Sequence, residues 1–162
     1  MCDNDKLKIL EEAIRHTEIR LEDFLKLGLA ADQRAMTFAS LSMAIAAILA
    51  SSAGGTTSPF IIYAGSISIV LGSALSMWSA KPKTFEVRGH RYEDWEDHIT
   101  NSDTYEDVLK SQAKENDDRL KDNLQSLKES GQIFTFSLVW TVLSTLMTMT
   151  LLLGFSAVEN IN

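Results

Sequence analysis

The sequence predicts an all-α integral membrane protein with three transmembrane helices, arranged as a hairpin plus a third crossing, and with an N-terminal and a central cytoplasmic helix. The 162 residues are 45% hydrophobic and 23% charged, an ordinary composition for a soluble protein. The charged residues are segregated, however. The 46 residues from 35 to 80 and the 29 residues from 130 to 158 contain no Asp, Glu, Lys or Arg. An apolar helix crosses a bilayer in about 20 residues, so the first run accommodates two crossings and the second accommodates one.

The positions of the basic residues predict the orientation. All 15 Lys and Arg residues lie in residues 1–34 or 81–129. Because basic residues concentrate on the cytoplasmic side of membrane proteins, we expect a multi-pass protein with a cytoplasmic N-terminus and an extracytoplasmic tail at 156–162. The net charge of −7 and the pI near 4.9 disfavour nucleic acid as a partner, which requires a basic surface.

Residues 1–34 are predicted to form a cytoplasmic amphipathic helix. Its stripe positions alternate at spacings of three and four, the heptad pattern of a helix that packs along one face. We expect this stripe to pack on the second cytoplasmic helix of the same chain or, alternatively, on another copy of the chain. The stripe consists of Leu7, Leu10, Ile14, Thr17, Leu21, Phe24 and Gly28.

Residues 35–80 are predicted to form a tight transmembrane hairpin, with crossings at about 35–52 and 59–80. Ser58 is suited to cap the second crossing, and Pro59 is favoured at a first helical position. Both crossings carry small residues every four positions, which lets two helix backbones approach closely in lipid. The helix-packing residues are Ser42, Ala46 and Ala50 on the first crossing and Ala64, Ser68, Gly72 and Ser76 on the second.

Residues 81–131 are predicted to form an acidic, mainly helical cytoplasmic segment. Pro82 stops the second crossing, and residues 84–100 have no clear period. Asp103 with Glu106 three residues later predicts a capped start for a helix that reaches about residue 130. The apolar stripe of this helix is expected to pack on the first helix and consists of Val108 or Leu109, Ala113, Leu120, Leu124 and Leu127.

The third transmembrane helix is predicted at 132–155 and carries hydroxyls on one face. Gly131, just before it, is interpreted as a hinge or as a glycine tolerated within a helix. The hydroxyl residues are spaced by four, three and four, so they share a face that either packs against another helix or lines a water path in an oligomer. They are Ser137, Thr141, Ser144 and Thr148.

The sequence contains no motif for enzymatic chemistry. A phosphate-binding glycine loop, a His-Glu-x-x-His zinc motif, a serine nucleophile elbow and a Cys-x-x-Cys pair are all missing. We therefore expect no enzyme, no cofactor and no metal. His90, Asp94 and His98 would share a helix face, but a solvated acidic segment is the preferred interpretation. The three predicted crossings contain no ionisable residue, which disfavours transport through a relay of charges.

One basic cluster is a candidate ligand-binding site, formed by Arg88, His90, Arg91 and Tyr92. Arginine pairs with phosphate through two parallel hydrogen bonds, and an aromatic ring can stack on a base. The alternative is that these residues, with Lys81 and Lys83, fix the orientation and contact anionic lipid headgroups. Trp78, just before Lys81, lies where an interfacial anchor is expected.

Several short motifs resemble the transmembrane effectors of Pycsar, a bacterial anti-phage defence system that signals with cyclic pyrimidine nucleotides. The entry to the first crossing, residues 31–35 (Ala-Asp-Gln-Arg-Ala), is similar to the Ala-Asp-Thr-Lys-Ala type of sequence in that family. Residues 81–83 (Lys-Pro-Lys) resemble its basic-Pro-basic exit from the second crossing, and the helix at 105–128 is similar to the one that leads to its last crossing. The resemblance covers roughly residues 8–153, with Gln33, Arg34 and the polar residues 129–132 departing from the family pattern.

The resemblance implies an effector in the bacterial inner membrane that impairs membrane integrity when it senses cCMP or cUMP. It implies a cyclic nucleotide as ligand, the lipid bilayer as partner and a homo-oligomer as the active form. A ligand must favour one arrangement of the helices over another in order to act. We further hypothesise that Asp32 and Arg34, at the membrane entry, couple the cytoplasmic and membrane regions.

Two other function classes fit the same sequence. A non-catalytic membrane scaffold would use the heptad stripe to recruit a partner and the hydroxyl face only for packing. A holin-like protein would form a pore by accumulation and would need no ligand. Membrane leakage separates the scaffold from the other two, and dependence on a ligand separates the effector from the holin-like protein.

Overall fold

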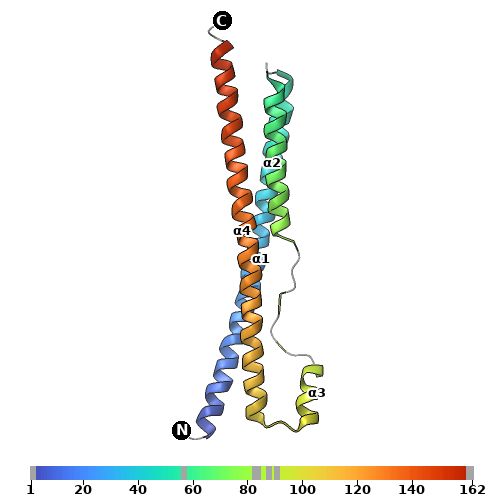
Figure 1. Ribbon diagram of the computed structural model, residues 1–162, viewed down its shortest axis with the longest axis vertical. Coiled ribbons are helices and arrows are strands. Elements are labelled where there is room, and N and C mark those ends of the chain that lie inside the picture. The colour runs from blue at the N-terminus through green and yellow to red at the C-terminus, as the bar shows by residue number, and fades with distance from the viewer. Residues whose placement is uncertain (1–2, 56–57, 82–84, 87–88, 90–91, 160–162) are drawn as a thin grey trace. The chain divides into compact units, whose positions relative to one another are not determined.

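The described part of the chain is mainly helical (Figure 1). A computed structural model describes residues 3–55, 58–81, 85–86, 89 and 92–159. The elements are α1 (Asp3–Ser51), a 3-10 turn η1 (Ser52–Gly55), α2 (Pro59–Ser79), α3 (Tyr92–Asn101) and α4 (Tyr105–Glu159). No strand occurs in these residues, which confirms the prediction of an all-α chain. By length and composition, α1, α2 and α4 can each cross a membrane.

Two of the helices are longer than the sequence analysis expected. The N-terminal amphipathic helix and the first apolar segment form the single helix α1, and the central polar helix and the third apolar segment form the single helix α4. The residues at each junction are compatible with this continuity, because residues 31–35 and 127–135 contain no proline. Gly131 lies inside α4 without ending it, and nothing lies within 4 Å of the position where its Cβ would be.

The chain divides into two compact units, and α1 and α4 each contribute to both. Met1–Leu29 and Lys83–Lys128 form one unit, called here the polar unit. Ala30–Pro82 and Glu129–Asn162 form the other, called here the apolar unit. The division follows the segregation of charge in the sequence.

In the apolar unit, small and hydroxyl side chains fill most of the interior, together with Ile62 and Ile69, and most large apolar side chains lie outside. Ser73, Ser76 and Ser137 are fully buried. The exposed side chains include Leu41, Ile48, Phe60, Ile67, Leu143 and Met147. A protein folded in water places its large apolar side chains in the core instead, so this distribution is typical of helices surrounded by lipid.

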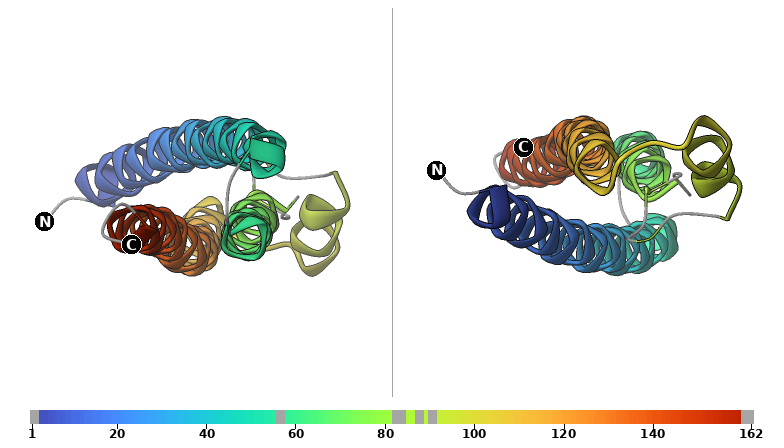
Figure 2. Two further views of the ribbon diagram at one scale, coloured as in Figure 1. Left: turned by 90° about the horizontal axis from the view of Figure 1, so that it is seen from above. Right: turned by 90° about the horizontal axis from the view of Figure 1, so that it is seen from below.

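Each pair of the three helices in the apolar unit is in contact, so they form a cluster rather than a row (Figures 1 and 2). The Ser76 hydroxyl of α2 donates to the Ala35 carbonyl of α1 over 2.8 Å. Phe38 of α1 meets Phe134 of α4 edge to face, with ring centroids 5.8 Å apart. The polarity of the interior therefore does not prevent close packing.

The contact face of α2 differs by one residue from the predicted stripe. Ser68 is partly buried, and Gly72 and Ser76 are buried, as the stripe requires, but Ala64 is exposed and Gly65 is buried in its place. The reason is that a helix has 3.6 residues per turn, so a stripe repeating every four residues drifts around the helix and leaves the interface. On α1, Ser42 and Ala46 are buried and Ala50 is partly buried.

Pro59 is the first residue of α2, as predicted, but Ser58 caps it differently. The Ser58 side chain makes no capping hydrogen bond. Its carbonyl oxygen instead accepts the Ile61 backbone N–H over 3.2 Å. The start of α2 therefore depends on proline and on a backbone turn.

In the polar unit, α1 and α4 pack in parallel along a heptad seam. Buried residues recur every seven positions at Ile14, Leu21 and Gly28 on α1 and at Leu109, Asn116 and Asn123 on α4. The predicted stripe of the first helix thus packs within one chain. Leu124, expected in the stripe of the central helix, is 53% exposed, because the asparagines occupy the seam beside it.

The start of α4 lies one residue later than the cap predicted from Asp103. Thr104 is the capping residue, since its hydroxyl and its carbonyl accept the backbone N–H groups of Asp107 and Val108. The Thr104 hydroxyl also donates to the Asp107 carboxylate, which holds the threonine side chain in the capping position. The Asp103 carboxylate instead accepts a hydrogen bond from His98 Nδ1 over 2.7 Å.

Gly65 provides a test of the packing between α2 and α4. A Cβ at Gly65 would collide with Thr148 Oγ1 and lie 2.6 Å from Thr148 Cγ2, so rotating the threonine does not relieve the clash. We expect Gly65→Ala to lower the free energy of unfolding by about 1–3 kcal/mol, a typical effect of overpacking, measured by denaturation in detergent micelles.

The matched control is Gly131→Ala in α4, where the added methyl group meets open space. Because alanine favours a helix over glycine by about 1 kcal/mol, this variant should be unchanged or more stable. Equal effects of the two substitutions would contradict the close approach of α2 to α4.

Candidate functional site

The connection between α2 and α3 is held against α1 and α4 of the polar unit at three described residues, Phe85, Glu86 and Gly89. We call these contacts the connector clamp. The first is steric: a Cβ at Gly28 would lie 2.7 Å from Phe85 Cζ. Because Gly28 has no side chain, the phenyl ring packs directly on the α1 backbone.

The second contact is a pair of hydrogen bonds between a side chain and one residue of the connection. The Glu86 backbone N–H donates to Asn123 Oδ1 over 3.0 Å, and Asn123 Nδ2 donates to the Glu86 carbonyl over 2.9 Å. Asn123 is 1% exposed, so an amide left without these partners would be strongly unfavourable. The asparagine and the connection therefore stabilise each other.

The third contact involves a charged side chain and a glycine. Arg119 Nη1 donates to the Gly89 carbonyl over 2.9 Å, and Nη2 donates to Glu115 over 2.6 Å. Gly89 has φ of +99°, a conformation that favours glycine. Glu115 holds the guanidinium in position while Arg119 binds the backbone of the connection.

The clamp residues Asn123 and Arg119 were not among the predicted site residues. The available signal was a polar residue at a seam position, since Asn116 and Asn123 are seven residues apart. Asn116 Nδ2 donates to Thr17 Oγ1 on α1 over 3.2 Å. The stripe predicted for the central helix consists of apolar residues only, so it does not include either asparagine.

The predicted ligand-binding cluster is flanked in sequence by the clamp. Arg88, His90 and Arg91 lie outside the described residues. Tyr92 is the first residue of α3, and its side chain is likewise not described. Glu86 and Gly89, which adjoin the cluster, are the residues that α4 holds.

Asp32 and Arg34 are not brought together by the fold. Both lie within α1, where residues two apart point to different faces. Asp32 is partly exposed, Arg34 is exposed, and no ion pair joins the two side chains. Their proposed coupling role therefore receives no geometric support as a pair.

The predicted hydroxyl face of α4 packs against α2. Ser137, Thr141 and Thr148 are buried, and their hydroxyls donate to carbonyls of their own helix. Ser144 is the exception, because its hydroxyl lies 2.7 Å from that of Ser68 on α2. Within one chain, the hydroxyl face therefore packs against another helix and does not line a water path.

A further hydrogen bond ties the start of α4 to α1. Tyr105 Oη donates to the Glu11 carboxylate over 3.0 Å. This hydrogen bond and the negative charge of Glu11 raise the pKa of Tyr105 above its ordinary value. The described residues contain no group of three His, Cys, Asp or Glu side chains arranged to hold a metal ion.

The fold and these contacts define an all-α chain with three candidate membrane-spanning helices and a polar helical unit. Comparison with protein-family models, with curated proteins and with solved structures gave no match for this chain. Its function is therefore argued from the arrangement of its own residues.

Asn123→Leu tests the connector clamp. Leucine fits a heptad seam but leaves the Glu86 N–H and carbonyl without the asparagine, so we expect the Glu86 amide to exchange with solvent about tenfold faster or more, given roughly 1–3 kcal/mol for a lost buried partner. Hydrogen exchange followed by mass spectrometry or NMR measures this change. Leu124→Ala, at an exposed neighbouring position, is the control and should leave the exchange of Glu86 unaltered. Unaltered exchange in Asn123→Leu as well would refute the clamp.

Proposed function

We propose that this chain is a membrane effector that senses a cyclic pyrimidine nucleotide through its polar unit and impairs the bacterial inner membrane through its apolar unit. One observation carries the proposal: the single helix α4 holds both the clamp residues Arg119 and Asn123 and the hydroxyl face from Ser137 to Thr148. A change at the clamp therefore acts directly on the helix that carries the hydroxyls.

Insertion of the apolar unit into a membrane is supported by its inverted distribution of side chains. Large apolar residues face outward, and serine, threonine and glycine face inward. The three candidate spans and the basic residues at 1–34 and 81–129 favour insertion with the N-terminus in the cytoplasm. The inner membrane follows from the resemblance to the Pycsar effectors.

Ligand sensing is assigned to the cationic cluster next to the clamp. A cyclic nucleotide carries a phosphate that Arg88 and Arg91 can pair with and a base that Tyr92 can stack on. To act, the ligand must bind more tightly when the connection adopts an arrangement other than the clamped one. Release of Glu86 and Gly89 would then free Asn123 and Arg119 on α4.

The response is assigned to the hydroxyl face of α4. Serine and threonine hydroxyls that bond to their own helix can leave a helix interface without losing that bond. Rotation of α4 in a homo-oligomer would turn the hydroxyls from α2 toward a shared water path. This rotation must break two hydrogen bonds between α4 and α2, the one between the Ser68 and Ser144 hydroxyls and the one from Trp140 Nε1 to the Ser68 carbonyl.

A scaffold is the second candidate, and a specific observation favours it. The hydroxyl face is already buried against α2 in one chain, so packing alone accounts for it. In that case the polar unit recruits a partner and the membrane stays intact. A holin-like pore former would cause leakage without any ligand.

Leakage from liposomes tests these functions. The full chain is reconstituted in phosphatidylethanolamine and phosphatidylglycerol vesicles loaded with a fluorescent dye, and cCMP, cUMP, cAMP and cGMP are added separately. We expect dye release with a cyclic pyrimidine only. Release without ligand would favour the holin-like function, and tight vesicles under all conditions, with insertion verified, would favour the scaffold.

Threonine-to-valine variants separate a water path from packing, because valine keeps the shape and removes the hydroxyl. We expect Thr141→Val with Thr148→Val to reduce ligand-dependent leakage about tenfold or more, since each lost hydroxyl raises the free energy of a wetted path by roughly 1 kcal/mol or more. The matched control is Thr135→Val with Thr150→Val, two exposed positions on α4, which should leak like the parent chain. Equal leakage from both pairs would contradict a hydroxyl-lined path.

A further inference from the structure

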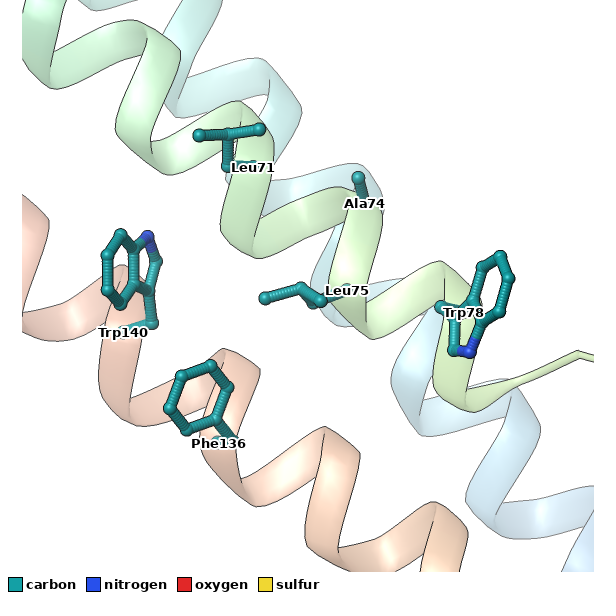
Figure 3. Close-up of a pocket in the computed structure, with 6 residues that line it drawn as sticks. All are labelled: Leu71, Ala74, Leu75, Trp78, Phe136 and Trp140. Atoms are coloured by element: carbon teal, nitrogen blue, oxygen red, sulfur yellow. The ribbon is translucent and has the colours of Figure 1, made fainter.

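An apolar groove of about 390 Å³ lies between α2 and α4 of the apolar unit. Figure 3 shows Leu71, Ala74, Leu75 and Trp78 along α2, with Phe136 and Trp140 on the facing side of α4. Its volume falls within the range of about 300–1,000 Å³ that small-molecule sites occupy. The lining side chains carry almost no polar atoms apart from the two indole N–H groups.

The α4 wall of the groove is fixed in place. Trp140 Nε1 donates to the Ser68 carbonyl on α2 over 3.1 Å. The Phe136 ring packs against the Trp140 ring with centroids 6.1 Å apart. Because the indole N–H is satisfied by α2, the ring surface of Trp140 is presented to the groove without an unmet hydrogen bond.

One end of the groove carries a positive charge. Lys81 Nζ lies 5.4 Å from the centroid of the Trp78 ring, a cation-π contact. Trp78 itself lines the groove and is 64% exposed. The groove is thus apolar along its length and cationic at the end where α2 finishes.

We infer that this groove binds one acyl chain of an anionic phospholipid, with the phosphate of the headgroup at Lys81. This inference rests on the membrane insertion that the proposed function includes. An acyl chain matches the apolar lining, an anionic phosphate matches Lys81, and tryptophan with lysine is the usual pair at the level of the headgroups.

A second copy of the chain fits the groove less well. Around a two-fold axis, a groove that met its own copy would bring two Lys81 side chains together. The uncharged runs 35–80 and 130–158 supply no carboxylate to separate them. A lipid phosphate provides the opposite charge that the groove requires.

Quenching of tryptophan fluorescence by brominated lipids tests the inference. The chain contains three tryptophans, so a Trp95→Phe background leaves Trp78 and Trp140 as reporters. Vesicles of phosphatidylcholine contain equal mole fractions of acyl-brominated phosphatidylglycerol or acyl-brominated phosphatidylcholine. We expect about fivefold enrichment of the anionic lipid at the tryptophans, the preference that one lysine provides near a membrane surface.

Two variants assign this preference to the groove. Lys81→Gln should remove the preference for phosphatidylglycerol, whereas Arg34→Gln, a basic residue on α1 outside the groove, should retain it. Ala74→Phe fills the groove and should also remove the preference, whereas Ala44→Phe, at an exposed position on α1, should retain it. Retention of the preference in Ala74→Phe would overturn the acyl-chain site.

The remaining outcomes separate this inference from the proposed function. Equal quenching by the two lipids in a chain that floats with the vesicles overturns the lipid site alone. Tryptophans protected from both lipids in such a chain would show the groove covered by a second copy and would overturn the inference in the same way. A chain that does not float with the vesicles refutes membrane insertion, and the proposed function fails with it.

Discussion

The heptad repeat of buried residues along α1 and along α4 is the constraint on which the rest of the structure depends. Buried residues recur every seven positions on α1 from Ile14 through Ser42 and on α4 from Leu109 through Ser137. A repeat of seven keeps the same face of a helix toward its partner. Each helix therefore needs no break where the composition changes from polar to apolar, and each contributes to both units.

The type of residue at the seam position of α4 differs between the two units. In the polar unit it holds Asn116, whose amide bonds across the interface to Thr17 of α1, and Asn123, whose amide bonds to the Glu86 backbone of the connection. In the apolar unit it holds Ser137, whose hydroxyl bonds to its own helix. An asparagine with a specific partner fixes register, whereas a serine that satisfies itself permits close approach without specifying a partner.

The sequence predicts the composition-driven features well and the specific polar contacts poorly. The three apolar segments, the heptad stripe of the first helix and the small-residue contacts of Gly72 and Ser76 follow from charge and periodicity. Continuity of α1 and α4 was missed because polar and apolar stretches were treated as separate elements. Asn123 was not predicted as a site residue because its partner is the backbone of Glu86, 37 residues away. A hydrogen bond to a backbone group produces no recognisable pattern of side chains in the sequence.

The two units differ in how strongly their contacts oppose a movement of α4. Moving α4 away from the connection separates Asn123, which is 1% exposed, from both of its hydrogen bonds to Glu86. Moving α4 against α2 breaks the hydrogen bond between Ser68 and Ser144 and the exposed one from Trp140 Nε1 to the Ser68 carbonyl, while Thr141 and Thr148 keep the bonds to their own helix. Since an unmet buried polar group is more unfavourable than a lost contact between small side chains, the clamp resists displacement more than the hydroxyl face does.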